Sequence, residues 1–449
     1  MEARYARRKT ELLQDCEVTP EIFDQVIPRL HRFLEPFVSS LSGHAPPQHA
    51  RTYVSGLLSD VERKNVESIA YHFGQDRLGL QGFIGWEDWD DTPMRQELLH
   101  QVGQQLGHRE GVLVVDPSAF PKSGRESVGV ARQWCGRLGK VDNGQVAIYL
   151  GYVSRQGHTL VDQRLFLPKD WTREKARLNK AGVPKDRQGY RTRHQLALER
   201  VAQDGPSLPH RWLAGDDEMG RPYWFRRRLR ERNERYLLSV PSNTSIRDLE
   251  VPEPEYSGKG RRPKRPWQSV SEWAERLGNG RWKRLEVRDG SKGPWVVEAV
   301  KCRVVSRTHR RQQGDEELLV VIRYLDRDEQ QVVKVDYYLS NTTAATGLCE
   351  LARVAKAAHR IEECLERSKS EAGLADDEVR HWTGWQQHHT LSLLATWFLE
   401  RETQRGKKMD PCDHGAADSP GHCDDLARGV SAQHKGAYVS TMPKALTTQ

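Results

Sequence analysis

Two aspartates in this chain each follow a short apolar run. This arrangement can place a carboxylate at the end of a buried strand, where it can bind a ligand or take part in catalysis. Residues 112–115 (VLVV) lead directly into Asp116, and "RWLAG" leads into Asp216. A charge at the end of a buried strand is costly unless it is paired or binds something. Asp116 also precedes a proline, so it could instead start a turn in which its carboxylate accepts hydrogen bonds from backbone N–H groups.

A third carboxylate, Glu362, lies on a long amphipathic stretch that favours a helix. Three carboxylates brought together repel one another, and a hard divalent cation relieves that repulsion. Mg²⁺ prefers oxygen ligands, and Mn²⁺ accepts the same donors. Two such ions can activate an attacking oxygen and stabilise a leaving oxygen in phosphodiester chemistry. Because a chain of this size has many acids, two Asp and one Glu are a weak signal by themselves.

The pattern of apolar residues predicts an α/β protein with helices at its start. Apolar residues spaced three and four apart predict helices, and apolar alternation between turn residues predicts strands. We expect a helical N-terminal region at 1–105, the first part of an α/β core at 106–244, a β-rich insertion at 245–345, core helices that carry Glu362 at 346–404, and a polar, disordered tail at 405–449.

Several individual elements follow from the same patterns. The strands we expect are 112–116, a hairpin within 144–168 around "SRQGH", a short strand that ends at Asp216, "YLLSVPSN" (236–243), "PWVVEAVKCRVVS" (294–306), "LLVVIRYLD" (318–326) and "QVVKVDYYLS" (331–340). A long helix is expected from near Thr346, with one apolar face formed by Leu351, Val354, Ala358, Ile361 and Leu365. A second helix is expected at 381–402.

The chain is basic, with a net charge of +8 and a pI near 9.0. Arginine and lysine cluster in 224–235, 258–267 and 304–311. Arginine suits phosphate because its planar fork donates two parallel hydrogen bonds, so we expect a nucleic-acid partner. For 224–235 a solvated helix face balanced by nearby glutamates is an alternative. For Trp267, packing is an alternative to stacking on a base.

Composition also bounds where the protein works. The chain has no apolar run long enough for a membrane span and no apolar core of a signal peptide at its start. Its seven cysteines follow no framework spacing, which suits free thiols in a reducing compartment. We therefore expect a cytoplasmic protein that does not bind a membrane.

Long motifs in a fixed order carry a family resemblance that covers roughly residues 20–400. They are "LLSDVERKNVESIA", "LQGFIGWEDWDDTPMRQEL", "VVDPSAFPKSGRESVGVARQWCGRLGKVDNGQVAIYLGYV", "QRLFLPKDWTREKARLNKAGVP", "RWLAGDDEMG" and "HRIEECLERSKSEAGLADDEVRHWTGWQQHH". Together they resemble the bacterial insertion-sequence transposases of the DDE superfamily, in the group numbered seven hundred and one.

The resemblance implies an RNase H-like catalytic core with a β-rich insertion between the second aspartate and the glutamate. It implies Mg²⁺-dependent cleavage and strand transfer of double-stranded DNA at terminal inverted repeats, by a dimer or higher oligomer. The implied triad is Asp116, Asp216 and Glu362, with Asp217 and Glu363 as the neighbouring alternatives. A metal-binding role for Asp116 is therefore favoured over a turn.

The spacing Glu362-x6-Lys369 matches the signature of this family and places both side chains on one helix face. Lys369 is expected either to contact a DNA phosphate or to be an ordinary surface lysine. The N-terminal helices and the basic insertion are expected to hold DNA. The candidate DNA-binding residues are Lys122, Arg261, Arg262, Lys264, Arg265, Trp267 and Lys369.

Two features depart from the family pattern. The signature usually has a tyrosine and an arginine where this chain has Ala355 and Ala358. A decayed transposase that only binds DNA, and a nuclease of the same fold that does not join strands, therefore remain as alternatives. The tail residues Cys412, His414, His422 and Cys423 could ligate zinc, but their spacing matches no standard finger, and chance is the favoured explanation.

Overall fold

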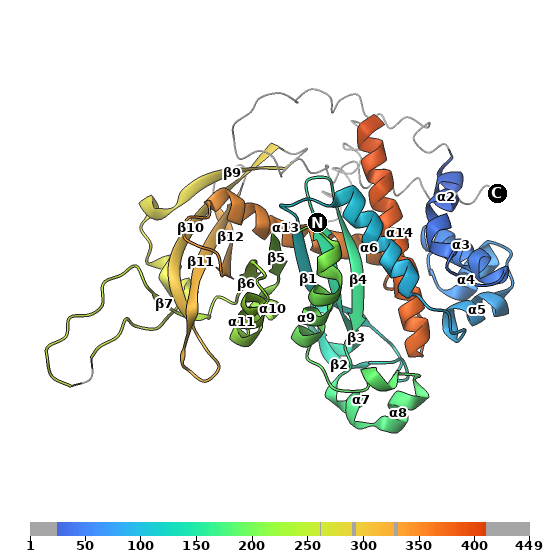
Figure 1. Cartoon of the computed structure of the whole chain (residues 1–449), viewed down its shortest axis with the longest axis horizontal. Helices are drawn as coiled ribbons and strands as arrows, with labels where there is room; N and C mark the ends of the chain where they lie inside the picture. Colours follow the sequence, from blue (N-terminus) through green and yellow to red (C-terminus); the bar gives the residue numbers. More distant parts are fainter. Residues whose placement is uncertain (1–24, 261, 290–292, 327–330, 410–449) are drawn as a thin grey trace.

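The computed structural model describes residues 25–260, 262–289, 293–326 and 331–409 of the chain. It is a mixed α/β fold built on one large sheet (Figure 1). The helices before the sheet are α2 (Val26–Val38), α3 (Ala45–Leu57), α4 (Val66–His72), α5 (Arg77–Gly85) and α6 (Thr92–Leu106). The tail cysteines and histidines named above lie outside the described residues.

Six strands of the sheet come from the segment between residues 112 and 239. They are β1 (Val112–Pro121), β2 (Ala131–Cys135), β3 (Lys140–Val153), β4 (His158–Leu165), β5 (Trp212–Gly215) and β6 (Tyr236–Ser239). The helices among them are α7 (Lys169–Arg173), α8 (Lys175–Lys180), α9 (Arg193–Asp204), α10 (Asp217–Gly220) and α11 (Tyr223–Glu231). The predicted hairpin is confirmed as β3 and β4, and the predicted strand at 236–243 is confirmed as β6.

The segment that was predicted to be a β-rich insertion contains six strands among the described residues. They are β7 (Ser245–Asp248), β8 (Gln268–Ser269), β9 (Lys283–Asp289), β10 (Gly293–Arg307), β11 (Gln313–Leu325) and β12 (Val332–Ser340), with the short helix α12 (Val270–Glu275) after β8. The chain then forms the two long helices α13 (Leu348–Glu371) and α14 (Trp382–Met409), which confirms both predicted C-terminal helices.

The twelve strands of the described residues belong to one sheet. Its order is β2-β3-β1-β5-β6-β12-β11-β10-β7-β8, with β4 beside β3 and β9 beside β10. Strands β1, β5 and β6 are parallel, whereas β3 is antiparallel to β1 and β12 is antiparallel to β6. Because β12 pairs directly with β6, the insertion continues the central sheet and is not a separate module.

Alternating side chains of the insertion strands face two different hydrophobic clusters. In β10, Val297 and Ala299 belong to the main core, whereas Val300, Cys302 and Val304 belong to a smaller cluster around Trp273 and Trp282. Period-two alternation of this kind is expected when both faces of a strand are covered. Helix α13 packs against strands of the core and of the insertion, so it lies across the junction between them.

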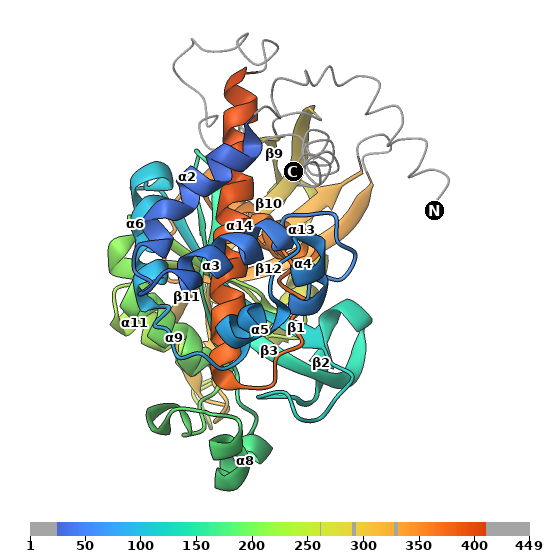
Figure 2. The same cartoon turned by 90° about the vertical axis from the view of Figure 1, so that its right-hand side faces the viewer.

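The N-terminal helices share the main core. Helix α14 contacts α3, α5, α6 and β4, and the N-terminal helices lie beside it in both views (Figures 1 and 2). In α2, Leu30, Phe33, Leu34 and Phe37 are buried at the spacing of one helix face, as predicted. The region is helical, but its buried side chains belong to the same cluster as those of the sheet. Within the described residues, no helix is both long and apolar enough to span a membrane.

Candidate active site

Asp116 lies inside β1 and not at its end, which corrects our expectation that the strand stops at 116. β3 has 14 residues and pairs with β1 from Val112 to Pro121, so the backbone beyond Asp116 keeps its hydrogen-bonding partners. The parallel partner β5 does stop, because its last pair with β1 is Val115 with Gly215. Asp116 is therefore the first residue beyond the parallel pairing.

Asp216 is the equivalent residue on the neighbouring strand, since it follows Gly215 directly. It caps the short helix α10, where its Oδ1 accepts a hydrogen bond from the N–H of Met219 at 2.9 Å. The adjacent Asp217 differs, because its side chain is 53% exposed and lies 3.5 Å from the guanidinium of Arg221. The register of two parallel strands thus brings Asp116 and Asp216 to one edge.

Glu362 comes to the same place on α13. Its side chain is 57% exposed and pairs with Nδ1 of His359 at 3.2 Å. The preceding residue, Ile361, packs on β3 at Gly151, where an added Cβ would lie 2.4 Å from Cδ1 of Ile361. A glycine at this position therefore lets α13 approach the sheet closely.

The charges of these residues interact. Burial raises the pKa of Asp116 well above its usual value, and the nearby charges of Asp216 and Glu362 raise it further, while Lys369 acts in the opposite direction. Burial also raises the pKa of Asp216 to about 7, against the hydrogen bond from Met219. The hydrogen bond with His359 lowers the pKa of Glu362. Concentrated negative charge without enough compensation is a property of cation-binding and catalytic sites.

Two cavities form a groove along these residues. One of about 560 Å³ is lined by Asp216 and the other, of about 1380 Å³, by Asp116 and Glu362. Ser118, Gly136 and Lys369 line both. The ammonium group of Lys369 also lies 5.1 Å from the centre of the Phe120 ring on β1. The groove therefore runs past all three candidate carboxylates and the candidate lysine.

The donor atoms in the groove suit a hard cation. The three carboxylates offer only oxygen, and the raised pKa values of the two aspartates are what an added positive charge would reverse. Among the residues that the structure describes, however, no group of three or more His, Cys, Asp or Glu side chains is arranged to hold a metal ion. The donor chemistry fits Mg²⁺ or Mn²⁺, whereas a closed set of ligands is not formed.

The remaining predicted DNA-binding residues lie elsewhere. Lys122 follows β1, and its Nζ pairs with Oδ1 of the buried Asp377 at 2.6 Å, so its charge is used inside the protein. Arg262, Lys264 and Arg265 lie in the long connection between β7 and β8, which projects from the insertion away from β1 (Figure 1). Arg261 lies outside the described residues.

Trp267 lies at the end of the same connection and is half-buried. Its ring is flanked by two guanidinium groups, that of Arg247 at 4.2 Å and that of Arg307 at 5.5 Å from the ring centre. Arg265 donates to the carbonyl of Val251 at 2.7 Å, which ties the connection to its own start. The structure therefore brings Lys369 to the carboxylates and places Trp267 in a second basic surface on the insertion.

Sequence reasoning missed several residues that line the groove. Trp134 on β2 is 57% exposed and lines the cavity beside Asp216, together with Arg193 and Arg221. The available signal was a tryptophan that follows arginine and glutamine in "ARQWCGR", and no local periodicity marked it as exposed. An exposed aromatic ring beside arginines is a typical platform for a nucleic-acid base.

The comparison with known families settles the class of protein. A model described as DDE superfamily endonuclease matches residues 36–294, which is more than half of the chain. The chain belongs to this superfamily. The matched region contains Asp116 and Asp216 and ends before Glu362.

A curated relative is similar over a shorter stretch of the chain. A probable transposase for insertion sequence element IS701 from Microchaete diplosiphon is 37% identical over 94 residues, which are 21% of this chain and 25% of that protein. The predicted resemblance to insertion-sequence transposases is thereby confirmed, although the chain matches only about a quarter of the relative's length.

Two solved structures are similar at a low level. A piggyBac transposase in a synaptic complex with hairpin DNA aligns with 95% of this chain and 79% of its own, at 10% identity and a TM-score of 0.39. The NurA nuclease from Sulfolobus solfataricus aligns with 62% of this chain and 80% of its own, at 10% identity and a TM-score of 0.24.

Proposed function

We propose that this protein is a transposase that cuts double-stranded DNA at the terminal inverted repeats of an insertion sequence and transfers the cut strand to a target. The observation that carries the proposal is the position of Asp116 and Asp216 on neighbouring parallel strands, with Glu362 in the same groove. In this proposal β4-β3-β1-β5-β6 is an RNase H-like core, and β7 to β12 are its insertion.

Asp116, Asp216 and Glu362 would hold one or two Mg²⁺ or Mn²⁺ ions. When bound, such ions activate an attacking oxygen and stabilise the leaving oxygen of a phosphodiester. The residues of the chain orient the DNA. Lys369, about two turns beyond Glu362 on α13, would contact a phosphate, and the ring of Trp134 would stack on a base.

The rest of the assembly follows from the same proposal. The basic surface around Trp267 and the N-terminal helices would bind DNA outside the groove. Two DNA ends must be held together for strand transfer, so the active form would be a dimer or a larger oligomer. The protein would act in the cytoplasm, at the nucleoid.

The two alanines that depart from the family signature bear on the alternative of a decayed transposase. Ala355 is 2% exposed and belongs to the main core, and Ala358 packs against that core. Both alanines thus contact the main core, and neither lines the groove. This arrangement favours an intact enzyme over a protein that only binds DNA.

The test is cleavage of DNA that carries the ends of the element encoding this chain, with Mg²⁺ or Mn²⁺. We expect Asp116→Ala, Asp216→Ala and Glu362→Ala to abolish cutting while DNA binding is kept. Asp217→Ala and Glu363→Ala are matched controls, because they remove the same charge from the adjacent position and should leave cutting largely intact.

Three results would contradict the proposal in different ways. Binding without any cutting by the wild type, with either metal, would identify a DNA-binding protein. Cutting without joined products would identify a nuclease of the same fold. Full activity in a variant of the triad would mean that the ligand is misplaced, and loss of activity in a control would identify the correct one.

A further inference from the structure

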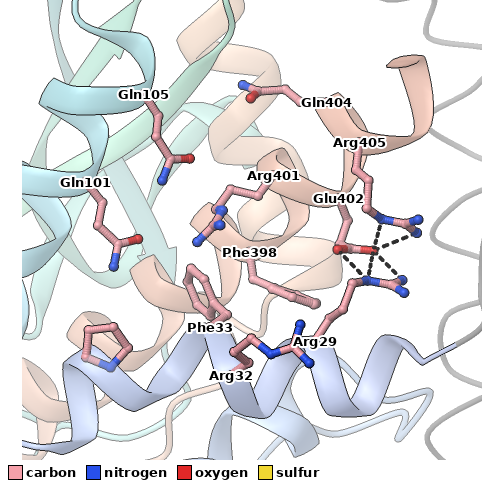
Figure 3. Close-up of a pocket in the computed structure, with 11 residues that line it drawn as sticks. Arg29, Arg32, Phe33, Gln101, Gln105, Phe398, Arg401, Glu402, Gln404 and Arg405 are labelled. Carbon is pink, nitrogen blue, oxygen red and sulfur yellow. Dashed lines mark hydrogen bonds and ion pairs between the residues drawn. The ribbon is translucent and has the colours of Figure 1, made fainter. Parts of the chain in front are cut away.

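A separate cavity, lined by several arginines, lies between helices α2, α6 and α14 (Figure 3). Its volume is about 390 Å³, and it shares no lining residue with the cavities of the candidate active site. This volume is in the range of about 300–1,000 Å³ that is typical of ligand pockets. The residues that line it are Arg29, Arg32, Phe33, Pro36, Gln101, Gln105, Phe398, Arg401, Glu402, Gln404 and Arg405.

Cationic side chains predominate in this cavity. Four arginines and one glutamate are the charged residues that line it. The carboxylate of Glu402 is only 8% exposed and is held by Nη2 of Arg29 at 2.7 Å and by Nη2 of Arg405 at 3.1 Å. Figure 3 shows both guanidinium groups directed at this one carboxylate. Glu402 thus orients these two arginines.

The other two arginines have no such partner. Within the described part of the chain, no carboxylate forms an ion pair with the guanidinium group of Arg32 or Arg401. Arg32 is exposed, whereas Arg401 is half-buried with its guanidinium carbon 5.3 Å from the centre of the Phe33 ring. Burial lowers the pKa of Arg401 in spite of the nearby charge of Glu402. A partly desolvated cation of this kind gains from an anion that enters the cavity.

We propose that this cavity binds a phosphate group of the DNA backbone, with Arg32 and Arg401 as the contacting residues. Arg29 and Arg32 are three residues apart on α2, and Arg401 and Arg405 are four apart on α14, so each pair lies on one helix face. The planar forks of Arg32 and Arg401 match phosphate oxygens. Because Arg32 is exposed, a phosphate that remains part of a long chain can reach it.

This inference rests on the proposed function, because it takes DNA as the ligand. It adds a DNA contact on the α2 and α14 side of the molecule, formed by residues that line neither the groove nor the basic surface around Trp267. The salt dependence of binding reports such a contact directly. Each phosphate contact contributes about 0.9 to the slope of log K against log [salt] on B-form DNA.

The experiment measures the affinity of the full-length protein for duplex DNA between about 50 and 200 mM salt, without divalent metal so that the DNA stays intact. For Arg32→Gln and for Arg401→Gln we expect the plot of log K against log [salt] to become less steep, with the magnitude of its slope smaller by up to about 0.9. Across this fourfold range of salt, the wild type should then lose about 3.5-fold more affinity than either variant. Arg32→Gln carries the test if Arg401→Gln does not fold.

The matched control is Arg51→Gln on α3. It removes the same charge from a neighbouring helix, but Arg51 pairs with Glu35 at 2.9 Å and does not line the cavity. Its slope should equal that of the wild type. An equal decrease in the control and in the cavity variants would show a general charge effect and would overturn the proposal.

Two further outcomes separate the alternatives. If the wild type binds and cuts DNA but Arg32→Gln and Arg401→Gln keep its slope, the cavity inference fails and the proposed function stands. If, in addition, inorganic phosphate raises the melting temperature of the wild type but not of these variants, the cavity is a site for a free anion. A wild type that does not bind DNA at any salt concentration would refute both proposals.

Discussion

Replacing Lys122 by methionine is expected to destabilise the fold, and not to weaken DNA binding selectively. Nζ of Lys122 donates to Oδ1 and to the backbone oxygen of Asp377, both at 2.6 Å. The side chain of Asp377 is 0% exposed and that of Lys122 is 10% exposed, so the pair is almost dry. Methionine keeps most of the volume of the side chain but removes the charge, and the carboxylate is left buried without its cation.

The magnitude follows from this burial. An exposed ion pair contributes about 0–1 kcal/mol, whereas removing one partner of a buried pair costs about 3–5 kcal/mol. Burial alone would raise the pKa of Asp377, but Lys122, His388 and His389 hold it below its usual value. A lowered pKa stabilises the folded state fully above the unfolded value of 3.8, and this contribution is lost as the pH falls through the folded pKa. The cost of Lys122→Met should therefore be large at neutral pH and shrink in acid.

The assay is unfolding in urea, followed by tryptophan fluorescence at pH 7 and at pH 3 to 4. The matched control is the double variant Lys122→Met with Asp377→Asn, which removes both charges and should recover part of the lost free energy of unfolding. If Lys122→Met unfolds at the same urea concentration as the wild type while the salt slope of DNA binding falls by about 0.9, the lysine is a DNA contact and the structural argument is wrong.

Three other substitutions test separate features. Gly151→Ala places a methyl group 2.4 Å from Cδ1 of Ile361. We therefore expect the free energy of unfolding to fall by about 1–3 kcal/mol and DNA cleavage to be slower. Unchanged values of both quantities would contradict the close packing of α13 on the sheet. Burial opposes the charge on His210, but its contact with Glu234 at 3.1 Å raises the pKa of His210. The pair therefore stabilises the folded state below about pH 6.5, and this stabilisation is lost as the pH rises through the pKa of the folded state. Between pH 6 and pH 8 the melting temperature of Glu234→Gln should therefore fall less than that of the wild type. An equal fall in both proteins would refute the pairing. Trp134→Ala should leave stability unchanged, because the ring is 57% exposed, and should weaken DNA binding by about 1–3 kcal/mol; unchanged affinity would exclude stacking.

Local patterns predicted most of the elements. Apolar alternation identified β10, β11 and β12, and the three-and-four spacing identified α13 with Leu351, Val354, Ile361 and Leu365 on its buried face. The pattern was less informative about where elements end. β1 continues past Asp116 because β3 supplies a partner strand of sufficient length, and that pairing is a tertiary contact which the sequence of β1 does not contain.

The candidate site was predictable in part for the same reason. Two strands that each lead into an aspartate indicated that Asp116 and Asp216 could lie together, and the register of β1 and β5 confirms their proximity. Lys122 was predicted to bind DNA, whereas the structure pairs it with Asp377, a residue 255 positions away in the sequence, and local patterns do not contain such a tertiary contact. Trp134 was missed because no local periodicity distinguishes an exposed tryptophan from one in the core.

The contacts between the N-terminal helices and α14 have a consequence during synthesis of the chain. α14 completes the packing of the N-terminal helices, and α13 brings Glu362 to strands made much earlier. About 290 residues separate Asp116 from the end of α14 at Met409, and at about 5–20 residues per second their synthesis takes roughly 15–60 s. Until α13 has been made, the nascent chain lacks Glu362 and Lys369, so a polypeptide that ends before this helix has only part of the candidate groove.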